Sequence, residues 1–299
     1  MLQLKTRVIT YGKSVLLWNN HFYGFCVSGL ALCSSLYLTD HALDIIFLAT
    51  IYIATVLYYT HAYMNEVVTE HNQERANWYQ KYKVHFIKRQ WILLGVAAIL
   101  LLTSIFKYPN LLHLDTLTIV FLLTSAIASY LYNSTSFKKN GFLKSAVIAY
   151  VWTVVGGYVP FYLNLKIGYT VNLSFITIAL YLIQLFIFIF LLAILFDIKD
   201  MPSDKKNKIQ TIPIQIGLNK LMPKIVLPII LIYIFIDVFQ YIAQPYSFVV
   251  LILNCFFYFL IYIVAKLAIN EYNISRSIIF IDGLMLIKAL IGIISHILI

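Results

Sequence analysis

Charged side chains are scarce in this 299-residue chain. Only 11% of its residues are Asp, Glu, Lys or Arg, whereas 62% are hydrophobic and the mean hydropathy is +0.86. A typical soluble domain has roughly 25% charged residues and could not bury so much apolar surface. The composition therefore excludes an ordinary soluble protein and predicts an integral membrane protein.

Cysteine is scarce as well, and Cys26, Cys33 and Cys255 lie in separate apolar stretches. This spacing excludes a disulfide framework and a thiolate metal site. The apolar stretches are as long as helices and do not alternate with polar residues, which excludes an outer-membrane barrel. The first twenty residues lack a compact apolar region ending in small residues, so we expect no cleavable signal peptide.

Apolar runs of about 20 residues, the length that crosses a bilayer as a helix, occur nine times. We predict an all-α bundle of about nine transmembrane helices around a central cavity, with residues 1–299 forming a single domain. The predicted spans are 15–37, 42–64, 91–106, 111–133, 142–163, 173–196, 221–242, 246–268 and 277–299.

Basic residues are distributed very unevenly between the loops that these spans define. With the N-terminus inside, every one of the 22 Lys and Arg residues except Lys107, Lys166 and Lys288 falls on the cytoplasmic side. The positive-inside rule therefore predicts a cytoplasmic N-terminus, and we expect the cell inner membrane. The net charge of +10 is explained by basic loops near anionic headgroups, without a nucleic-acid partner.

Carboxylates are also distributed unevenly, since six of the twelve occur in two short segments. These segments follow the second and sixth spans, so both are predicted on the cytoplasmic side. At about 100° per residue, the acids of each segment share one helical face. The first segment carries Glu66, Glu70 and Glu74, and the second carries Asp197, Asp200 and Asp204.

Carboxylates at a membrane boundary need water, a cation or a partner. Mg²⁺ binds a few carboxylates and completes its coordination with water and phosphate oxygens. Two acidic segments facing each other could therefore hold Mg²⁺ against a diphosphate. The alternative interpretation is that these acids pair with Arg75, Lys199, Lys205 and Lys206 in solvated loops.

The second acidic segment, FDIKDMPSDKKNKIQTIPIQIG, resembles the second aspartate motif of the UbiA superfamily of intramembrane prenyltransferases. The match extends over Asp197, Asp200, Asp204, Thr211, Pro213 and Gly217, with Lys208 where a glycine is usual. The segment LYNSTSFKKNGFLKSAVIAYVW is similar to the family's Tyr…Lys-Arg segment. Lys138 and Lys139 occupy its basic positions.

The first acidic segment departs from the family pattern. The family shows Asn-Asp-x-x-Asp-x-x-x-Asp, and alignment on Asn65 places Glu66, Thr69 and Gln73 at the aspartate positions. A shift by one residue gives Glu66, Glu70 and Glu74, which keeps the spacing with longer side chains. The chain is thus expected to be a divergent member with a degenerate first motif.

The resemblance implies a Mg²⁺-dependent transfer of an isoprenyl group from a prenyl diphosphate donor to a hydrophobic acceptor within the bilayer. It implies catalytic roles for Asp200, Asp204 and Lys138. The implied Mg²⁺ ligands are Asp197, Asp200, Asp204, Glu66, Glu70 and Glu74. The implied substrate-binding residues are Asn65, Lys139, Lys199, Tyr150, Trp152 and Tyr158, the aromatic ones because ring faces stabilise an allylic cation.

Two other functions stay open at this point. The degenerate first motif is compatible with a non-catalytic relative that binds an isoprenoid or another lipid. A transporter is the second alternative, but its signature of Gly- or Pro-broken spans with charges at mid-membrane is weak here, because the acids cluster at one membrane face.

Overall fold

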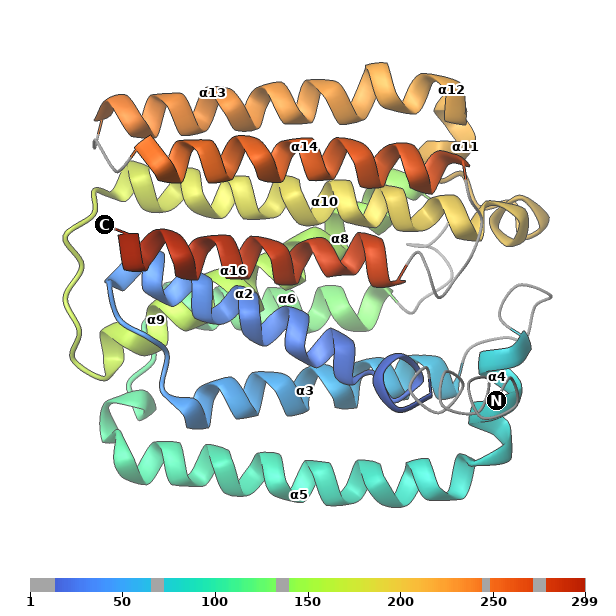
Figure 1. Cartoon of the computed structure of the whole chain (residues 1–299). Coiled ribbons are helices and arrows are strands. Elements are labelled where there is room, and N and C mark those ends of the chain that lie inside the picture. The colour runs from blue at the N-terminus through green and yellow to red at the C-terminus, as the bar shows by residue number, and fades with distance from the viewer. Residues whose placement is uncertain (1–13, 66–72, 133–139, 244–247, 271–277, 299) are drawn as a thin grey trace, which may run out of the picture.

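The computed structural model describes residues 14–65, 73–132, 140–243, 248–270 and 278–298. These residues form helices, and the described part of the chain has no β-strand beyond a single bridge between Asn140 and Gln210. Figure 1 shows the long helices lying side by side in one bundle. The all-α membrane bundle predicted from the sequence is confirmed.

The first part of the bundle consists of a short π-helical turn at Ser14–Trp18 followed by α2 (His21–Thr39), α3 (Ile45–Met64), α4 (Gln73–Lys81), α5 (Lys83–Lys107) and α6 (Thr116–Tyr132). A continuous helical segment then comprises α8 (Gly141–Thr153), a π-helical turn (Val154–Tyr158) and α9 (Val159–Lys166). The remainder comprises α10 (Phe175–Lys206), α11 (Ile212–Ile216), α12 (Leu218–Leu221), α13 (Leu227–Ala243), α14 (Phe248–Asn270) and α16 (Gly283–Leu298).

Eight helical stretches within the described residues are long and apolar enough to cross a membrane, and α6 is a shorter apolar helix. They coincide with the nine predicted spans, so the chain is a multi-pass helical membrane protein. The first span begins later than predicted, because Asn20 has a left-handed backbone conformation that interrupts the helix just before His21. The third begins earlier, since α5 already starts at Lys83.

The two segments that follow the second and sixth spans lie at the same end of the bundle. Figure 1 shows α4 beside the end of α3 and shows α11 and α12 beyond the end of α10, all at the right. We call this end, with the start of α8, the acidic end. The connections from α2 to α3 and from α5 to α6 lie at the opposite end. Four membrane crossings lie between these two segments, and an even number of crossings returns the chain to the same side.

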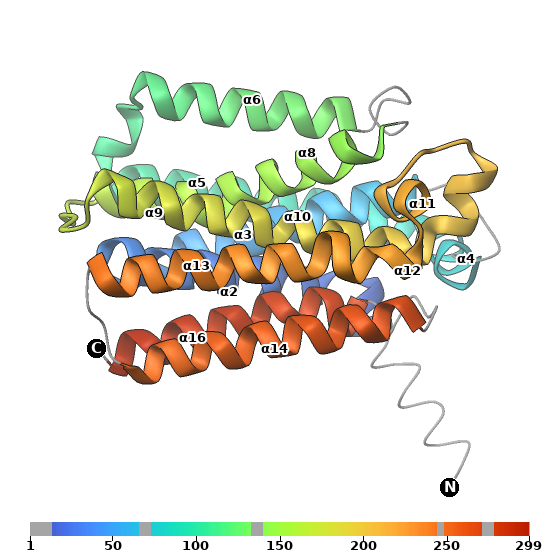
Figure 2. The same cartoon turned by 90° about the horizontal axis from the view of Figure 1, so that it is seen from above.

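Burial divides the helices into an inner and an outer set. The inner set is α2, α8 and α10, whose side chains form most of the hydrophobic core. The outer set includes α5, α6 and α13, which expose large apolar residues such as Trp91, Phe106 and Phe235. Such exposure suits a lipid-facing surface, because lipid tails are as apolar as these side chains. Figure 2 shows α6 at one edge of the bundle, with α8 between α6 and the other helices.

Candidate active site

The three aspartates of the second acidic segment lie on the last turns of α10, which continues through Pro202 to Lys206. The chain then reverses direction at Lys208, which has a left-handed φ of 56°. The backbone N–H of Ile209 donates a 2.8 Å hydrogen bond to the carbonyl oxygen of Asp204. This turn sends residues 209–211 back toward the start of α8.

A very close backbone contact joins that returning segment to α8. Gly141 N donates a 3.0 Å hydrogen bond to the carbonyl oxygen of Gln210, which also accepts from the side chain of Gln215. A Cβ atom on Gly141 would lie 2.3 Å from the Cα of Thr211, so only glycine fits there. Asn140 caps α8 by accepting from two backbone N–H groups. The start of α8 is therefore fixed against the end of α10.

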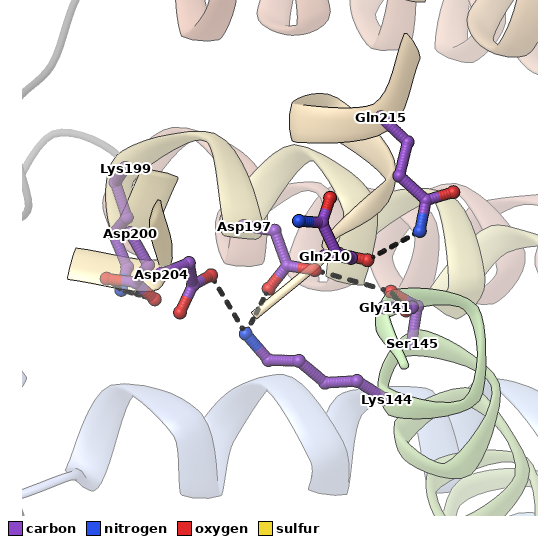
Figure 3. A network of polar contacts seen from close by, with 9 residues as sticks. All are labelled: Gly141, Lys144, Ser145, Asp197, Lys199, Asp200, Asp204, Gln210 and Gln215. Carbon is purple, nitrogen blue, oxygen red and sulfur yellow. Dashed lines mark hydrogen bonds and ion pairs between the residues drawn. The ribbon is translucent and has the colours of Figure 1, made fainter. Parts of the chain in front are cut away.

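This contact places Lys144, one turn into α8, directly against the acidic face of α10. The Nζ atom of Lys144 lies 2.7 Å from Oδ1 of Asp197 and 3.5 Å from Oδ2 of Asp204. Ser145 Oγ donates a 3.5 Å hydrogen bond to Asp197 Oδ2. Figure 3 shows the Lys144 ammonium between the two carboxylates. One buried ammonium thus bridges two acids that are two helical turns apart.

The remaining aspartate of the segment, Asp200, pairs with its neighbour in sequence. Lys199 Nζ lies 2.8 Å from both carboxylate oxygens of Asp200 and 4.1 Å from the centre of the Phe196 ring. The Asp200 side chain keeps 37% of its surface exposed, whereas those of Asp197 and Asp204 keep 5% and 8%. Lys199 therefore acts as an ion-pair partner, as the alternative interpretation of the sequence expects, and Asp200 remains the most accessible of the three acids.

Burial also changes the acidity of Asp204, which lies just beyond the membrane-spanning part of α10. Loss of hydration raises the pKa of its carboxyl to about 6, with Lys144 acting in the opposite direction and Asp197 and Asp200 adding to the rise. By formal charge, the three carboxylates and the ammonium groups of Lys144 and Lys199 leave the five-residue cluster with one net negative charge.

The first acidic segment is only partly described. Glu74 is exposed in the first turn of α4, and Asn65 ends α3, where its side chain donates a 3.0 Å hydrogen bond to the carbonyl oxygen of His61. Glu66, Glu70, Lys138 and Lys139 lie outside the described residues. The prediction that both acidic segments face one shared space therefore stays a prediction.

A basic residue of α4 does approach the cluster on α10. Arg75 is buried, and its guanidinium carbon lies 3.8 Å from the centre of the Tyr63 ring. Its charge is near enough to Asp200 to act on it electrostatically. The α4 helix is fixed in place by Tyr79, whose hydroxyl donates to the Trp18 carbonyl and accepts a 2.8 Å hydrogen bond from Asn20. The segment after the second span thus contributes a buried cation whose charge acts on Asp200.

Aromatic rings form a continuous path from Arg75 into the bundle. Tyr63 contacts Tyr59 with ring centres 5.8 Å apart, and Tyr59 stacks on Trp152 at 5.7 Å with an interplanar angle of 9°. Tyr23 also stacks on Tyr59, at 4.1 Å. We call Tyr23, Tyr59, Tyr63 and Trp152 the aromatic wall. It joins α2, α3 and α8, and Trp152 is the predicted substrate-binding aromatic that belongs to it.

The other two predicted aromatics of this segment point toward α6. The Tyr150 hydroxyl lies 2.5 Å from Thr124 Oγ1, and the Tyr158 hydroxyl lies 2.7 Å from Thr118 Oγ1. Tyr158 is 14 residues beyond Lys144, which corresponds to about 21 Å along a helix. Both hydroxyls therefore hold α6 against the continuous α8–α9 segment.

Comparison with known proteins shows where this architecture occurs. The chain aligns with a UbiA homologue from Archaeoglobus fulgidus bound to GPP and Mg²⁺, with a TM-score of 0.59 at 14% identity, over 96% of this chain and 99% of the homologue. The Cd²⁺-bound form of a UbiA homologue from that organism gives a TM-score of 0.56 at 13% identity, over 96% and 98%. This chain has the UbiA fold.

A further structure supports that assignment. Digeranylgeranylglyceryl phosphate synthase matches with a TM-score of 0.58 at 18% identity, over 95% of this chain and 98% of the synthase. No protein-family model matches the sequence, and no curated protein matches it either. The UbiA resemblance that the sequence suggested is thus confirmed for the chain as a whole, at the level of the fold.

The UbiA fold raises the question of whether Mg²⁺ fits here. Among the described residues, no three His, Cys, Asp or Glu side chains gather into a ready-made metal site. Asp197 is fully engaged by Lys144 and Ser145, whereas Asp204 is reached by Lys144 only at 3.5 Å and Asp200 is partly exposed. Asp204 therefore has the most free capacity for Mg²⁺, and Asp200 would bind the ion only by releasing Lys199, whose ammonium pairs with both of its oxygens.

Lys144 is the residue of this site that the sequence analysis missed. The distribution of basic residues places Lys144 on the cytoplasmic side, and it falls inside the predicted span 142–163. An ionisable residue within a membrane span is a functional candidate by default, and that signal could have identified it. The sequence predicts Arg75 in a solvated loop, and its burial corrects that position.

Proposed function

We propose that this chain is an intramembrane prenyltransferase that transfers an isoprenyl group from a prenyl diphosphate to a hydrophobic acceptor. The observation that carries the proposal is the position of the Asp200–Asp204 cluster within the UbiA fold. The cluster lies at one end of the bundle. There the diphosphate of a prenyl donor can contact ionic side chains while the isoprenyl chain of the donor lies among the helices. The relative from Archaeoglobus fulgidus, with GPP and Mg²⁺ bound, supports a donor of this class.

In this proposal the basic residues of the acidic end act on the leaving diphosphate. The bond between the allylic carbon and the diphosphate oxygen breaks, and the electron pair leaves with the oxygen. Lys199 and Arg75 stabilise the charge that develops on that group, because preorganised cations act most strongly where water is excluded. Lys138 and Lys139 are proposed to serve the same group.

Asp200 and Asp204 are the residues proposed to hold Mg²⁺, with Glu66, Glu70 and Glu74 as further candidate ligands. When bound, the ion neutralises diphosphate charge and makes it a better leaving group. The role of the two aspartates is to fix that positive charge at the acidic end of the bundle. The expected Mg²⁺ dependence follows from this role.

The aromatic wall is proposed to stabilise the allylic cation that forms as the diphosphate leaves. Trp152 lies eight residues beyond Lys144 on α8, about 12 Å along a helix, which is within reach of an isoprenyl chain extending inward from the acidic end. Ring faces attract cations without adding a nucleophile that could capture them. The acceptor then forms a bond to the allylic carbon and loses a proton.

Turnover of radiolabelled prenyl diphosphates in detergent tests the proposal. The purified chain is incubated with donors of several chain lengths, an extract of apolar lipids as the acceptor source, and either Mg²⁺ or EDTA. We expect Mg²⁺-dependent conversion of the label into a product that partitions into organic solvent. Absence of conversion with every donor would refute the enzymatic proposal.

A second candidate function is binding of an isoprenoid or another lipid without turnover. The observation that favours it is the neutralisation of Asp197, Asp200 and Asp204 by Lys144 and Lys199, which reduces the charge available for a metal ion. Saturable retention of labelled prenyl diphosphate without conversion would favour this candidate over the enzyme.

A further inference from the structure

Lys144 occupies a position where a metal ion would be expected between two carboxylates. Its Nζ atom contacts Oδ1 of Asp197 and Oδ2 of Asp204, and the three side chains keep only 11%, 5% and 8% of their surface exposed. The arrangement is rigid, because the start of α8 is capped by Asn140 and fixed by the contact between Gly141 and Gln210. The ammonium is therefore built into the site.

We propose that Lys144 is a resident cation that takes the place of one divalent ion between Asp197 and Asp204. This inference rests on the proposed function, since it concerns how the same site neutralises a diphosphate. Asp197 serves to hold Lys144 in this position. Lys144 is a positioning residue that sets how many divalent ions the site binds.

Geometry and charge both support this role. A divalent ion bound to Asp197 and Asp204 needs oxygen ligands at about 2.0–2.1 Å. The ammonium lies between the same two carboxylates, so such an ion would come within direct contact of a like charge in a poorly hydrated environment. The two cations therefore exclude each other, and the covalently attached one is always present.

The substitution that tests this role is Lys144→Met, which keeps the approximate length of the side chain and removes its charge. We expect this variant to bind one more Mn²⁺ per chain than the parent, or to bind its Mn²⁺ at least tenfold more tightly. The electron paramagnetic resonance signal of free Mn²⁺, measured in detergent without any donor, gives the number of Mn²⁺ ions bound per chain and their dissociation constant. Lys144→Arg keeps the charge and should bind Mn²⁺ like the parent.

Lys205→Met is the matched control, because Lys205 is an exposed lysine at the end of α10, beside Asp204 in the sequence, and makes no ion pair with the described carboxylates. Its Mn²⁺ binding should equal that of the parent. Equal stoichiometry and affinity in Lys144→Met and the parent would overturn the proposal. Additional binding in Lys144→Arg would overturn it too, because the charge would then not be what excludes the ion.

Loss of folding in Lys144→Met would also be informative. The resident-cation role predicts that Mn²⁺ restores this variant, since an ion that binds only the folded state stabilises it by mass action. If the variant stays unfolded at saturating Mn²⁺ while Lys144→Met/Asp197→Asn folds, Lys144 only neutralises buried acid and the proposal fails. Mn²⁺ binding is measured without any prenyl diphosphate donor. A chain that lacks prenyltransferase activity would therefore fail the turnover assay but would still show the predicted Mn²⁺ binding.

Discussion

Gly141 at the start of α8 lies directly on Thr211, which follows the reversal after α10. A Cβ atom at Gly141 would stand 2.3 Å from the Cα of Thr211 and 2.4 Å from the carbonyl oxygen of Gln210. Both obstacles are backbone atoms, so a larger residue can be accommodated only if α8 and the returning segment separate. The contact that brings Lys144 to Asp197 and Asp204 thus depends on the absence of one methyl group.

Gly141→Ala should therefore disrupt the acidic end. We expect a lower melting temperature in detergent and a loss of most donor turnover, because the Lys144 bridge loses its support. Gly95→Ala is the matched control. Gly95 lies within α5 with no atom within 4 Å of an added Cβ, so alanine should leave turnover unchanged and raise stability by roughly 0.5–1 kcal/mol. Normal turnover in Gly141→Ala would show that the contact does not support the site.

Asp200→Ala and Asp204→Ala should abolish Mg²⁺-dependent consumption of prenyl diphosphate while the protein remains folded. Removing a group that stabilises leaving-group charge commonly costs on the order of 10²–10³ in rate. Asp40→Asn, an exposed substitution at the opposite end of the bundle, should leave the rate unchanged. Retained turnover in both alanine variants would contradict the mechanism.

Glu70→Ala tests whether the first acidic segment still contributes. Its effect on turnover should be smaller than that of Asp200→Ala, because a decayed ligand position contributes little when it is removed. The comparison is made at saturating Mg²⁺ and again at limiting Mg²⁺. An equal loss in the two variants would instead mean that glutamate has replaced aspartate functionally.

Trp152→Leu should slow turnover more than Tyr158→Phe. Trp152 belongs to the aromatic wall through its stack on Tyr59, and leucine removes the ring face that a cation would meet. Tyr158→Phe keeps the ring and removes only the contact with Thr118 Oγ1, so its cost should appear in thermal stability. Equal rates in the two variants would show that the aromatic wall does not contribute to the reaction rate.

Asp237 should hold the outer helix α13 in place without taking part in turnover. This buried carboxylate accepts hydrogen bonds from Gln184 of α10, at 2.8 Å, and from Tyr258 of α14. Asp237→Leu leaves both donors without their acceptor and should lower stability by about 0.6–1.7 kcal/mol, the range for hydrogen bonds between membrane helices. Asp237→Asn retains an acceptor and should lose less. Unfolding titrations with SDS in mixed micelles would measure both.

Asp44 should make the stability of the opposite end depend on pH. It caps α3 by accepting from Ile46 N, and its other oxygen accepts from Lys107 and Tyr108 at 2.7 Å. Although partial burial opposes ionisation, these partners lower the pKa of Asp44 below its usual value. The stabilisation is therefore complete above pH 4 and is lost as pH falls through the lowered pKa.

Asp44→Ala should accordingly lower the melting temperature at pH 7, with about 1 kcal/mol expected from the lost cap. The difference between parent and variant should shrink as pH falls below 4. A difference that stays constant down to pH 2 would show that the charge of Asp44 does not contribute.

The sequence by itself determined the number of spans, the common side of the two acidic segments and the shared face of Asp197, Asp200 and Asp204. These properties depend on hydropathy and on helical period, which are local and can be read along the chain.

Only the tertiary structure decided which cation meets which acid. Lys144 and Asp197 are 53 positions apart, and Arg75 and Asp200 are 125 apart, so their proximity depends on how whole helices pack. The same holds for Tyr150 and Tyr158, which face α6, and for Trp152, which faces Tyr59. The helical period predicts which residues share a face of a helix. Which other helix packs against that face depends on side-chain fit between segments distant in sequence. In this protein the contact of Gly141 with Thr211 brings α8 against the end of α10.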